Sequence, residues 1–244
     1  MQLHGTRRQT PETVDIVFMR PEATVTSLFP MFMKLEGKAC LVVGAGKVGE
    51  PKIGGLISTG ARIQVVAIEA SDKVREWAGD GAIDLKLRRF SPNDLDGKFI
   101  AVIATNSKSL NEFIYREAVR RGVLCNVVDV PEYCDFFYPA VVNRGDLQIA
   151  ISTAGQSPSL AQKLRQQLER QFPPAYTDWV AHLGETRRLI LASPLDKDRK
   201  LDLLHSLASR EAFEAALSQM EERCEEVSAT CSQEKSFAVE SEQI

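Results

Sequence analysis

Residues 39–69 read ACLVVGAGKVGEPKIGGLISTGARIQVVAIE. The apolar run CLVV is followed by the pattern G-x-G-x-x-G, which is formed by Gly44, Gly46 and Gly49. A helix-length segment comes next, and a second run rich in β-branched residues starts at Ile63. This order of strand, glycine turn, helix and strand is typical of the first half of a dinucleotide-binding fold.

The three glycines have separate physical roles in such a motif. Gly44 permits the tight turn, Gly46 lets the backbone approach a pyrophosphate, and Gly49 lets the helix pack closely on the strand. The free N–H groups and the positive end of the helix then face the phosphates. The alternative is a glycine-rich turn in an α/β core that binds no nucleotide.

Two features of this stretch depart from the usual motif. Pro51 lies early in the expected helix, and the pair Gly54-Gly55 costs about 1 kcal/mol per glycine relative to alanine. The only acid near the expected ribose-binding position is Glu69, so ribose recognition would rest partly on the main chain at 67–69. No arginine follows the second strand to receive a 2′-phosphate, which favours NAD over NADP.

Composition places few limits on the function of the 244-residue chain. It is 44% hydrophobic and 26% charged with a net charge of −3, so nothing suggests a nucleic-acid partner. No apolar run approaches the roughly 20 residues that cross a membrane, and no signal pattern opens the chain. We therefore expect a cytoplasmic protein. The five cysteines form no C-x-x-C pair and the three histidines are scattered, so no metal site is expected.

Hydrophobic periodicity divides the chain into five parts. The expected fold class is α/β, with a Rossmann-like parallel sheet, then a short β dimerisation segment and an all-helical C-terminal region. The expected parts are a disordered extension (1–27), an NAD-binding domain (28–130), the β segment (131–157), a helical domain (158–225) and a disordered tail (226–244).

Within these parts the patterns predict individual elements. A helix at 108–121 carries an apolar stripe of Leu110, Phe113, Ile114 and Ala118. A hairpin pairs 136–142 with 147–152 around a four-residue turn. The other expected elements are a helix to Gly79 capped by Ser71, strands at 83–87, 99–104 and 123–128, a helical turn at 91–95, a helix at 158–171 capped by Ser157, and helices at 175–192 and 196–224.

Polar residues follow several of the expected strands. Thr105 ends one strand and Asp129 ends another, so both should lie with the glycine turn at the carboxyl edge of the sheet, where open α/β sheets bind ligands. A turn acid ahead of Pro131 is an equally good interpretation of Asp129. The hairpin has too little sheet to be stable alone, which suggests that it packs against a second copy of the chain.

Four segments together resemble the precorrin-2 dehydrogenase family of the siroheme-synthase N-terminal type. They read KACLVVGAGKV (38–48), IAT (103–105), CNVVDVP (125–131) and IAISTAGQSP (149–158). The resemblance covers about residues 28–190. The chain departs from the family at Pro51-Lys52, where an arginine commonly precedes the lysine, and this puts the local helix geometry in doubt.

The resemblance implies an activity and its partners. The family oxidises precorrin-2 to sirohydrochlorin with NAD⁺, and some members also insert Fe²⁺ to give siroheme. The family also forms homodimers through the segment after the sixth strand. The residues do not separate the dehydrogenase from the additional ferrochelatase. A non-catalytic NAD-binding module that carries or senses tetrapyrroles is a further hypothesis.

Site residues are implied position by position. The family's catalytic acid falls on Asp129, which would take a proton as hydride leaves, and its second site residue, a serine, falls on Thr153. The cofactor residues implied are Gly44, Gly46, Lys47, Val48, Ile68, Glu69 and Thr105. The substrate pocket would include Asn126 and Ser152. Apart from the family's pattern, Arg144, Lys163 and Arg165 flank the predicted pocket and could hold the eight carboxylates of the substrate. A solvated helix face is an equally good interpretation of these three cations.

Overall fold

The computed structural model describes residues 28–218, and internal contacts divide the chain between Pro30 and Met31. The expected disordered extension (1–27), the expected tail (226–244) and the end of the expected 196–224 helix lie outside the described residues. In the described part of the chain, no helix is long and apolar enough to span a membrane.

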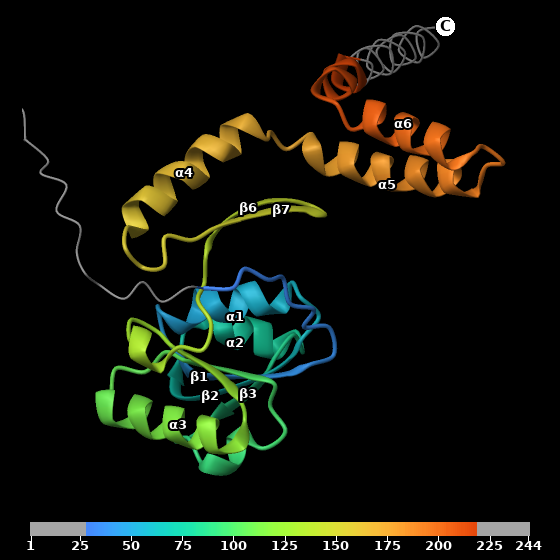
Figure 1. The fold of residues 1–244 in the computed structure, drawn as a ribbon. Helices are drawn as coiled ribbons and strands as arrows, with labels where there is room; N and C mark the ends of the chain where they lie inside the picture. Colours follow the sequence, from blue (N-terminus) through green and yellow to red (C-terminus); the bar gives the residue numbers. More distant parts are fainter. Residues whose placement is uncertain (1–27, 219–244) are drawn as a thin grey trace, which may run out of the picture. The chain divides into compact units, whose positions relative to one another are not determined.

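A five-stranded parallel sheet forms the first part of the fold, in the order β3-β2-β1-β4-β5 (Figure 1). The expected parallel sheet is confirmed, because each apolar run of the sequence supplies one strand. The strands are β1 (Ala39–Ala45), β2 (Arg62–Ala70), β3 (Asp84–Leu87), β4 (Ile100–Ile103) and β5 (Leu124–Val127).

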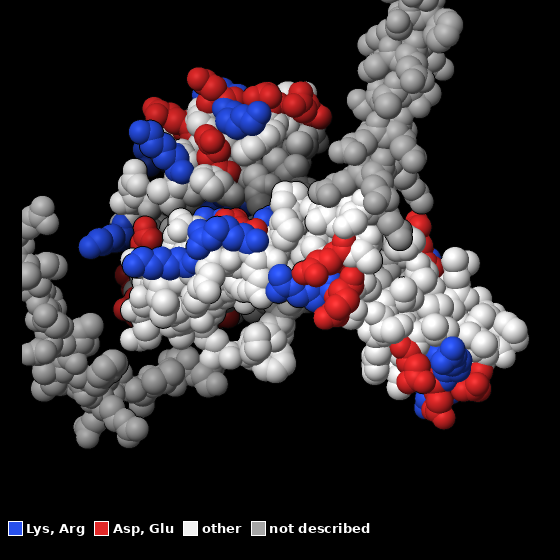
Figure 2. All heavy atoms as spheres, turned by 90° about the horizontal axis from the view of Figure 1, so that it is seen from above, with Lys and Arg blue, Asp and Glu red and all other residues white. Residues whose placement is uncertain are grey.

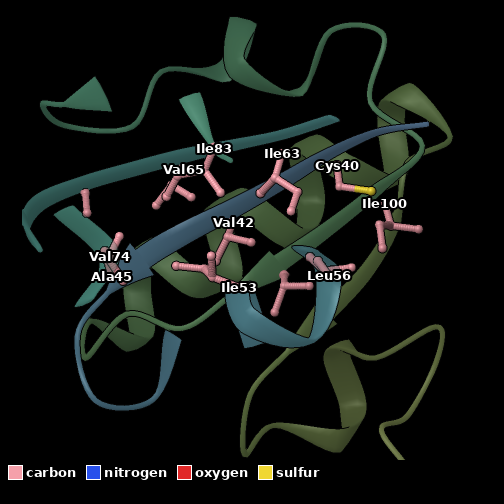
Figure 3. Packing of buried hydrophobic residues seen from close by; sticks show 12 residues of the cluster. Cys40, Val42, Ala45, Ile53, Leu56, Ile63, Val65, Val74, Ile83 and Ile100 are labelled. Atoms are coloured by element: carbon pink, nitrogen blue, oxygen red, sulfur yellow. The ribbon is translucent and has the colours of Figure 1, made fainter. Parts of the chain in front are cut away.

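Helices cover both faces of this sheet (Figure 1). Alternate residues of β1 point to opposite faces, so Cys40 and Val42 join one core cluster, and Leu41 and Val43 join the other. Figure 3 shows the first cluster, in which strand residues meet Ile53 of the helix after the glycine turn. The covering elements are α1 (Gly49–Ile57) and α2 (Asp72–Gly79) on the first face, and α3 (Lys108–Arg121) and the 3₁₀ turn η1 (Pro92–Leu95) on the second.

Helix α1 forms despite its unfavourable residues. Pro51 is its third residue, where the backbone N–H would have no intrahelical partner, so the ring costs no hydrogen bond. A Cβ on Gly54 would lie 3.1 Å from the Trp77 ring, so this glycine leaves room for the indole of α2. Gly55 meets nothing within 4 Å and has no such packing role.

The apolar stripe expected on α3 is partly wrong. Ile114 and Ala118 are fully buried, but Phe113 is 44% exposed. The helix is rotated so that Asn111 and Glu117 share the buried face. Both polar side chains have partners there, Asn111 at Thr105 and Glu117 at Arg121, which makes their burial acceptable.

Residues 136–139 are not the strand that the sequence predicts. After the short turn η2 (Pro131–Tyr133), the chain runs back along β5. Asp135 accepts a hydrogen bond from Cys125 N (2.8 Å), and the Asn126 amide donates to Phe136 O (2.7 Å). These hydrogen bonds hold residues 135 and 136 against β5. The strand pairing that was expected for residues 136–139 therefore does not form.

The hairpin itself is shorter than expected. It pairs β6 (Ala140–Arg144) with β7 (Leu147–Ile151), so its turn has two residues and not four. Gly145 has φ +62°, which suits the first central position of such a turn. As expected, Leu147, Ile149 and Ile151 share the more buried face.

Three helices follow the hairpin. They are α4 (Pro158–Gln171), α5 (Tyr176–Ala192) and α6 (Lys197–Leu207). Ser157 caps α4 by accepting from Leu160 N (3.3 Å), as its position before Pro158 predicts. The expected single helix 196–224 is interrupted at 208–209, and a new helical stretch begins at Arg210.

A buried carboxylate ties η1 to the sheet. Asp94 is 7% exposed and accepts hydrogen bonds from Arg88, Gln64 and Ser91 N. The Arg88 guanidinium holds the pKa of the Asp94 carboxyl below its usual value. A carboxyl whose pKa is lowered in the folded state stabilises the fold above its unfolded pKa, and this contribution disappears as the pH falls through the folded pKa.

We therefore expect Asp94→Asn to lower the free energy of unfolding at pH 7 by about 2 kcal/mol, because charge-assisted hydrogen bonds are lost. Urea denaturation checks the value, and the difference from wild type should shrink once the pH falls below about 4. Asp84→Asn is the matched control, since Asp84 pairs with Lys86 at an exposed site and should change stability by less than about 0.5 kcal/mol. Equal stability of Asp94→Asn and wild type at pH 7 would contradict the assignment.

Candidate functional site: the carboxyl edge of the parallel sheet

The glycine turn has the geometry that its sequence predicts. Gly44 has φ +103°, and a Cβ there would lie 2.3 Å from Ala104 O at the end of β4. A Cβ on Gly49 would lie 2.1 Å from Gly44 O, so only glycine allows α1 to start so close to β1. At Gly46 a Cβ would meet nothing within 4 Å, so this position opens outward.

The loop between β1 and α1 is accessible. Gly46, Lys47 and Val48 are exposed, and the N-cap residue Val48 makes no side-chain bond to the first turn of α1. The N–H groups of that turn therefore have no side-chain acceptor, which suits a phosphate ligand. The loop between β1 and α1 and the first turn of α1 therefore fit the pyrophosphate of a dinucleotide.

The end of β2 lies beside this loop. Ala70 pairs with Ala45, and Ser71 N donates to Ala45 O (3.0 Å). Ile68 and Glu69 are exposed but lie inside β2, which runs to Ala70 and so is longer than the sequence predicts. Both side chains remain available to a ligand at this edge.

Thr105 is held in place by a residue that the sequence reasoning missed. The Thr105 hydroxyl donates to the Asn111 side chain, and the Asn111 amide donates back to Thr105 O (3.1 Å). Asn111 is 6% exposed. In the sequence Asn111 is simply a polar residue within the helix. Only the observed rotation of α3 shows that it faces the core.

Asp129 occupies an unusual backbone position directly after β5. Its φ is +63°, in the left-handed region that non-glycine residues seldom adopt and that aspartate tolerates better than most. The chain is fixed on both sides, since Val128 N donates to Ile103 O (2.9 Å) and Val130 N donates to Val127 O (3.1 Å). The carboxylate is exposed at the edge that carries the glycine turn.

The segment after Asp129 is held by one buried and one partly buried polar side chain. Asn126 is 6% exposed and holds Phe136 O, and the Cys134 thiol donates to Val127 O (3.2 Å). Burial raises the pKa of the Cys134 thiol, which keeps it protonated as a donor. The amide of Asn126 is thus used in positioning residues 134–136.

Lys52 is a second residue that the sequence reasoning missed. Its ammonium lies over the Tyr138 ring, 4.0 Å from the centroid. Burial lowers the pKa of Lys52, and the Asp129 carboxylate opposes that shift, so the two charges act on each other. Burial also raises the pKa of Tyr138 to about 12, so the phenol stays neutral.

The loop 152–157 supplies the other expected catalytic residue. The Thr153 hydroxyl accepts from Ser157 N (3.1 Å), and the Ser152 hydroxyl accepts from Ala154 N (3.1 Å). Ala154 has φ +50°, the only other non-glycine residue with positive φ in the described chain. Among the described residues, no hydrogen bond joins this loop to Asp129.

The three expected substrate cations differ in their surroundings. Arg144 donates to Phe172 O (2.7 Å) and Glu169 O (3.2 Å) at the end of α4, and Arg165 pairs with Glu169. The Arg144 guanidinium ties the hairpin to the end of α4, whereas the Arg165–Glu169 pair lies within α4. Lys163 is exposed on α4.

A surface depression of about 400 Å³ lies at the opposite edge of the sheet. Its lining includes Ala39 and Arg62, the first residues of β1 and β2, so it is at the amino end of the strands. It is separate from the glycine turn and from Asp129.

The parallel sheet with its glycine turn defines a Rossmann-type dinucleotide-binding fold. Residues 31–140 match a family model described as NAD(P)-binding, and residues 144–171 match the sirohaem biosynthesis protein central model.

Siroheme synthases from several bacteria match the same region of the chain. Siroheme synthase of Nitrosococcus oceani is 40% identical over 147 residues, which is 60% of this chain and 31% of that protein. Siroheme synthase 1 of Aeromonas hydrophila is 33% identical over 82% of this chain and 43% of its own length. The chain spans about a third of the length of the first curated relatives that it matches.

A solved structure matches more completely. The precorrin-2 dehydrogenase SirC has a TM-score of 0.70 and 30% identity, with 80% of this chain and 96% of SirC covered. The chain therefore belongs to the precorrin-2 dehydrogenase and siroheme synthase family.

We expect Gly46→Ala to fold normally and to weaken NAD⁺ binding at least about tenfold, because a Cβ at the open position would separate the backbone from the pyrophosphate. Isothermal titration with NAD⁺ measures the affinity. Gly55→Ala, in the helix that follows the loop, is the control, since its Cβ also meets nothing and should leave NAD⁺ binding unchanged while stabilising α1 by about 1 kcal/mol. Unaltered affinity in Gly46→Ala would place the cofactor elsewhere.

Proposed function

We propose that this chain oxidises precorrin-2 to sirohydrochlorin with NAD⁺ in siroheme biosynthesis. The observation that carries the proposal is the Asp129 carboxylate, exposed at the same sheet edge as a dinucleotide-type glycine turn. The 30% identity to a precorrin-2 dehydrogenase over nearly all of its length supports the choice of substrate.

The reaction removes two hydrogens from the macrocycle, one as hydride and one as a proton. Bound NAD⁺ supplies the hydride acceptor. Asp129 takes the proton, since its carboxylate is exposed and is held in a fixed backbone turn. The Thr153 hydroxyl accepts one backbone N–H, so its own proton remains available to a substrate oxygen.

The remaining expected residues have supporting roles in this proposal. Gly44, Gly46, Lys47 and Val48 would hold the pyrophosphate, with Thr105 at the end of β4 beside them. Ile68 and Glu69 would face the ribose from the end of β2. Asn126 would shape the pocket by holding the segment after Asp129, and Ser152 would orient the Thr153 loop.

Lys163 and the two arginines Arg144 and Arg165 are the expected partners of substrate carboxylates. Both arginines already bind groups of the chain at the end of α4. Lys163 is the more available of the three, because it is exposed. In this proposal residues 28–130 bind the cofactor and residues 131–157 form the dimerisation segment. Residues 158–225 form the helical part.

Fe²⁺ insertion into sirohydrochlorin is a second proposed activity, in which Asp129 would accept pyrrole protons. In the described residues no group of three or more histidine, cysteine or acidic side chains could hold a metal, so Fe²⁺ would enter as a substrate. We propose a cytoplasmic location, which the free thiols of Cys40, Cys125 and Cys134 support.

A homodimer is the third part of the proposal. Helices α5 and α6 contain no buried residue, and Leu189 is 73% exposed. Leu191, Leu195 and Leu201 are 41–49% exposed in the same region. Figure 2 shows wide areas without charged side chains on the visible face. Apolar side chains that remain exposed on these helices favour burial against a second copy.

Anaerobic incubation with precorrin-2 and NAD⁺, followed by visible spectroscopy, tests the proposed oxidation. We expect sirohydrochlorin only when NAD⁺ is present, and a further enzyme-dependent change when Fe²⁺ is added if the second activity exists. If NAD⁺ binds but the spectrum does not change, the chain is a non-catalytic tetrapyrrole carrier or sensor.

Asp129→Asn tests the proposed base. Asparagine has the same shape and tolerates positive φ, so the turn should persist while turnover falls roughly 10²- to 10⁴-fold and NAD⁺ binding is retained. Glu132→Gln, at an exposed acid three residues later, is the control and should keep wild-type turnover. Retained turnover in Asp129→Asn would remove this residue from the mechanism.

Sedimentation velocity at micromolar concentration tests the homodimer, and we expect twice the mass of one chain. Leu189→Glu should shift the protein toward monomer, because it places a charge in the proposed interface. Val119→Glu, at an exposed apolar residue of α3, should leave the dimer intact. A wild-type monomer would refute the proposal.

A further inference from the structure

The side chain of Lys52 lies in an environment that is unfavourable for a cation. It is the fourth residue of α1, near the positive end of the helix, where positive charge is disfavoured. It is half-buried, and its ammonium faces the Tyr138 ring at 4.0 Å from the centroid. The ring supplies part of the lost solvation through a cation–π contact.

Three separate elements bring this ammonium to the proposed active site. Lys52 comes from the helix that begins at the glycine turn, and Tyr138 comes from the segment anchored on β5 by Asn126. Asp129 lies between that segment and β5, and its carboxylate acts on the Lys52 charge. The cation therefore lies between the helix that begins at the cofactor loop and the segment that follows the proposed base.

Lys52 has no carboxylate within ion-pair distance in the described part of the chain. The ion pairs there involve other cations, among them Lys73 with Glu76 and Arg165 with Glu169. A half-buried ammonium without an anion at 4.0 Å or less is available to an incoming carboxylate. Arg144, by contrast, already donates to main-chain oxygens of α4.

We infer that Lys52 receives a carboxylate of the tetrapyrrole substrate beside Asp129, which makes it a specificity-determining residue of this chain. The inference rests on the proposed function. The substrate is a polyanion, so the Asp129 carboxylate repels it at the point where the two must meet. The ammonium of Lys52 offsets that repulsion, and partial burial strengthens the pairing because screening by water is reduced.

Lys52→Met tests the inference, because it keeps the length and the apolar stem of the side chain while it removes the charge. We expect the KM for precorrin-2 to rise about 10- to 100-fold, with kcat changed by less than about threefold and NAD⁺ affinity unchanged. Lys52→Arg should restore most of the lost affinity. A residue that served only the fold would not separate KM from kcat in this way.

Lys73→Met is the matched control. Lys73 also lies near an aromatic ring, 5.8 Å from the Trp77 centroid, but it pairs with Glu76 on α2. It should keep wild-type KM and kcat. If Lys52→Met gives too little folded protein, Lys52→Gln replaces it, with thermal melting to confirm that the fold is intact.

A titration with sirohydrochlorin in the absence of NAD⁺ separates this inference from the proposed function. Wild type should bind it more tightly than Lys52→Met by a factor similar to the change in KM, and high salt should reduce the difference. Equal affinity of the two proteins, or a loss of kcat without a change in KM, would overturn the role of Lys52. If wild type binds sirohydrochlorin but does not oxidise precorrin-2, the proposed function fails and the titration still decides the inference.

Discussion

The site depends on two close backbone contacts at the carboxyl edge of the sheet. A Cβ on Gly44 would lie 2.3 Å from Ala104 O, and a Cβ on Gly49 would lie 2.1 Å from Gly44 O, so both positions require glycine. Because neither glycine carries a side chain at these contacts, the first turn of α1 is held close to the carboxyl ends of β1 and β4. Gly46, which meets nothing, is then the point where the loop opens to a ligand.

Hydrogen bonds between separate segments hold another part of the site. Asn126 and Asp135 hold the chain after β5 against the sheet, although an apolar run such as 136–142 would otherwise favour a longer hairpin strand. This arrangement leaves Asp129 in a turn with positive φ and brings Tyr138 over Lys52. Asn126 is buried and would be costly there without its hydrogen-bond partner, whereas Asp135 is exposed. Together the two side chains fix the segment after β5.

The helical part of the chain buries fewer of its apolar side chains than the sheet domain does. Its aromatic residues cluster around Tyr176 and Phe213, whose ring centroids are 4.2 Å apart, but most of its leucines are partly or fully exposed. The sheet domain, by contrast, buries two continuous clusters, one on each face. A helix with an exposed apolar face gains stability mainly from what packs on it, which is why assembly matters for this part of the chain.

The positions of the strands along the chain, the glycine turn and the caps at Ser71 and Ser157 could be predicted from the sequence, because each depends on neighbours within a few residues. The sequence also predicted the edge at which Asp129 lies, since strand ends of a parallel sheet share one side. The rotation of α3, the path of residues 136–139 and the two-residue turn at Gly145 were decided only by tertiary contacts. So was the contact between Lys52 and Tyr138, because a local pattern carries no information on which distant segments supply a hydrogen bond or a charge.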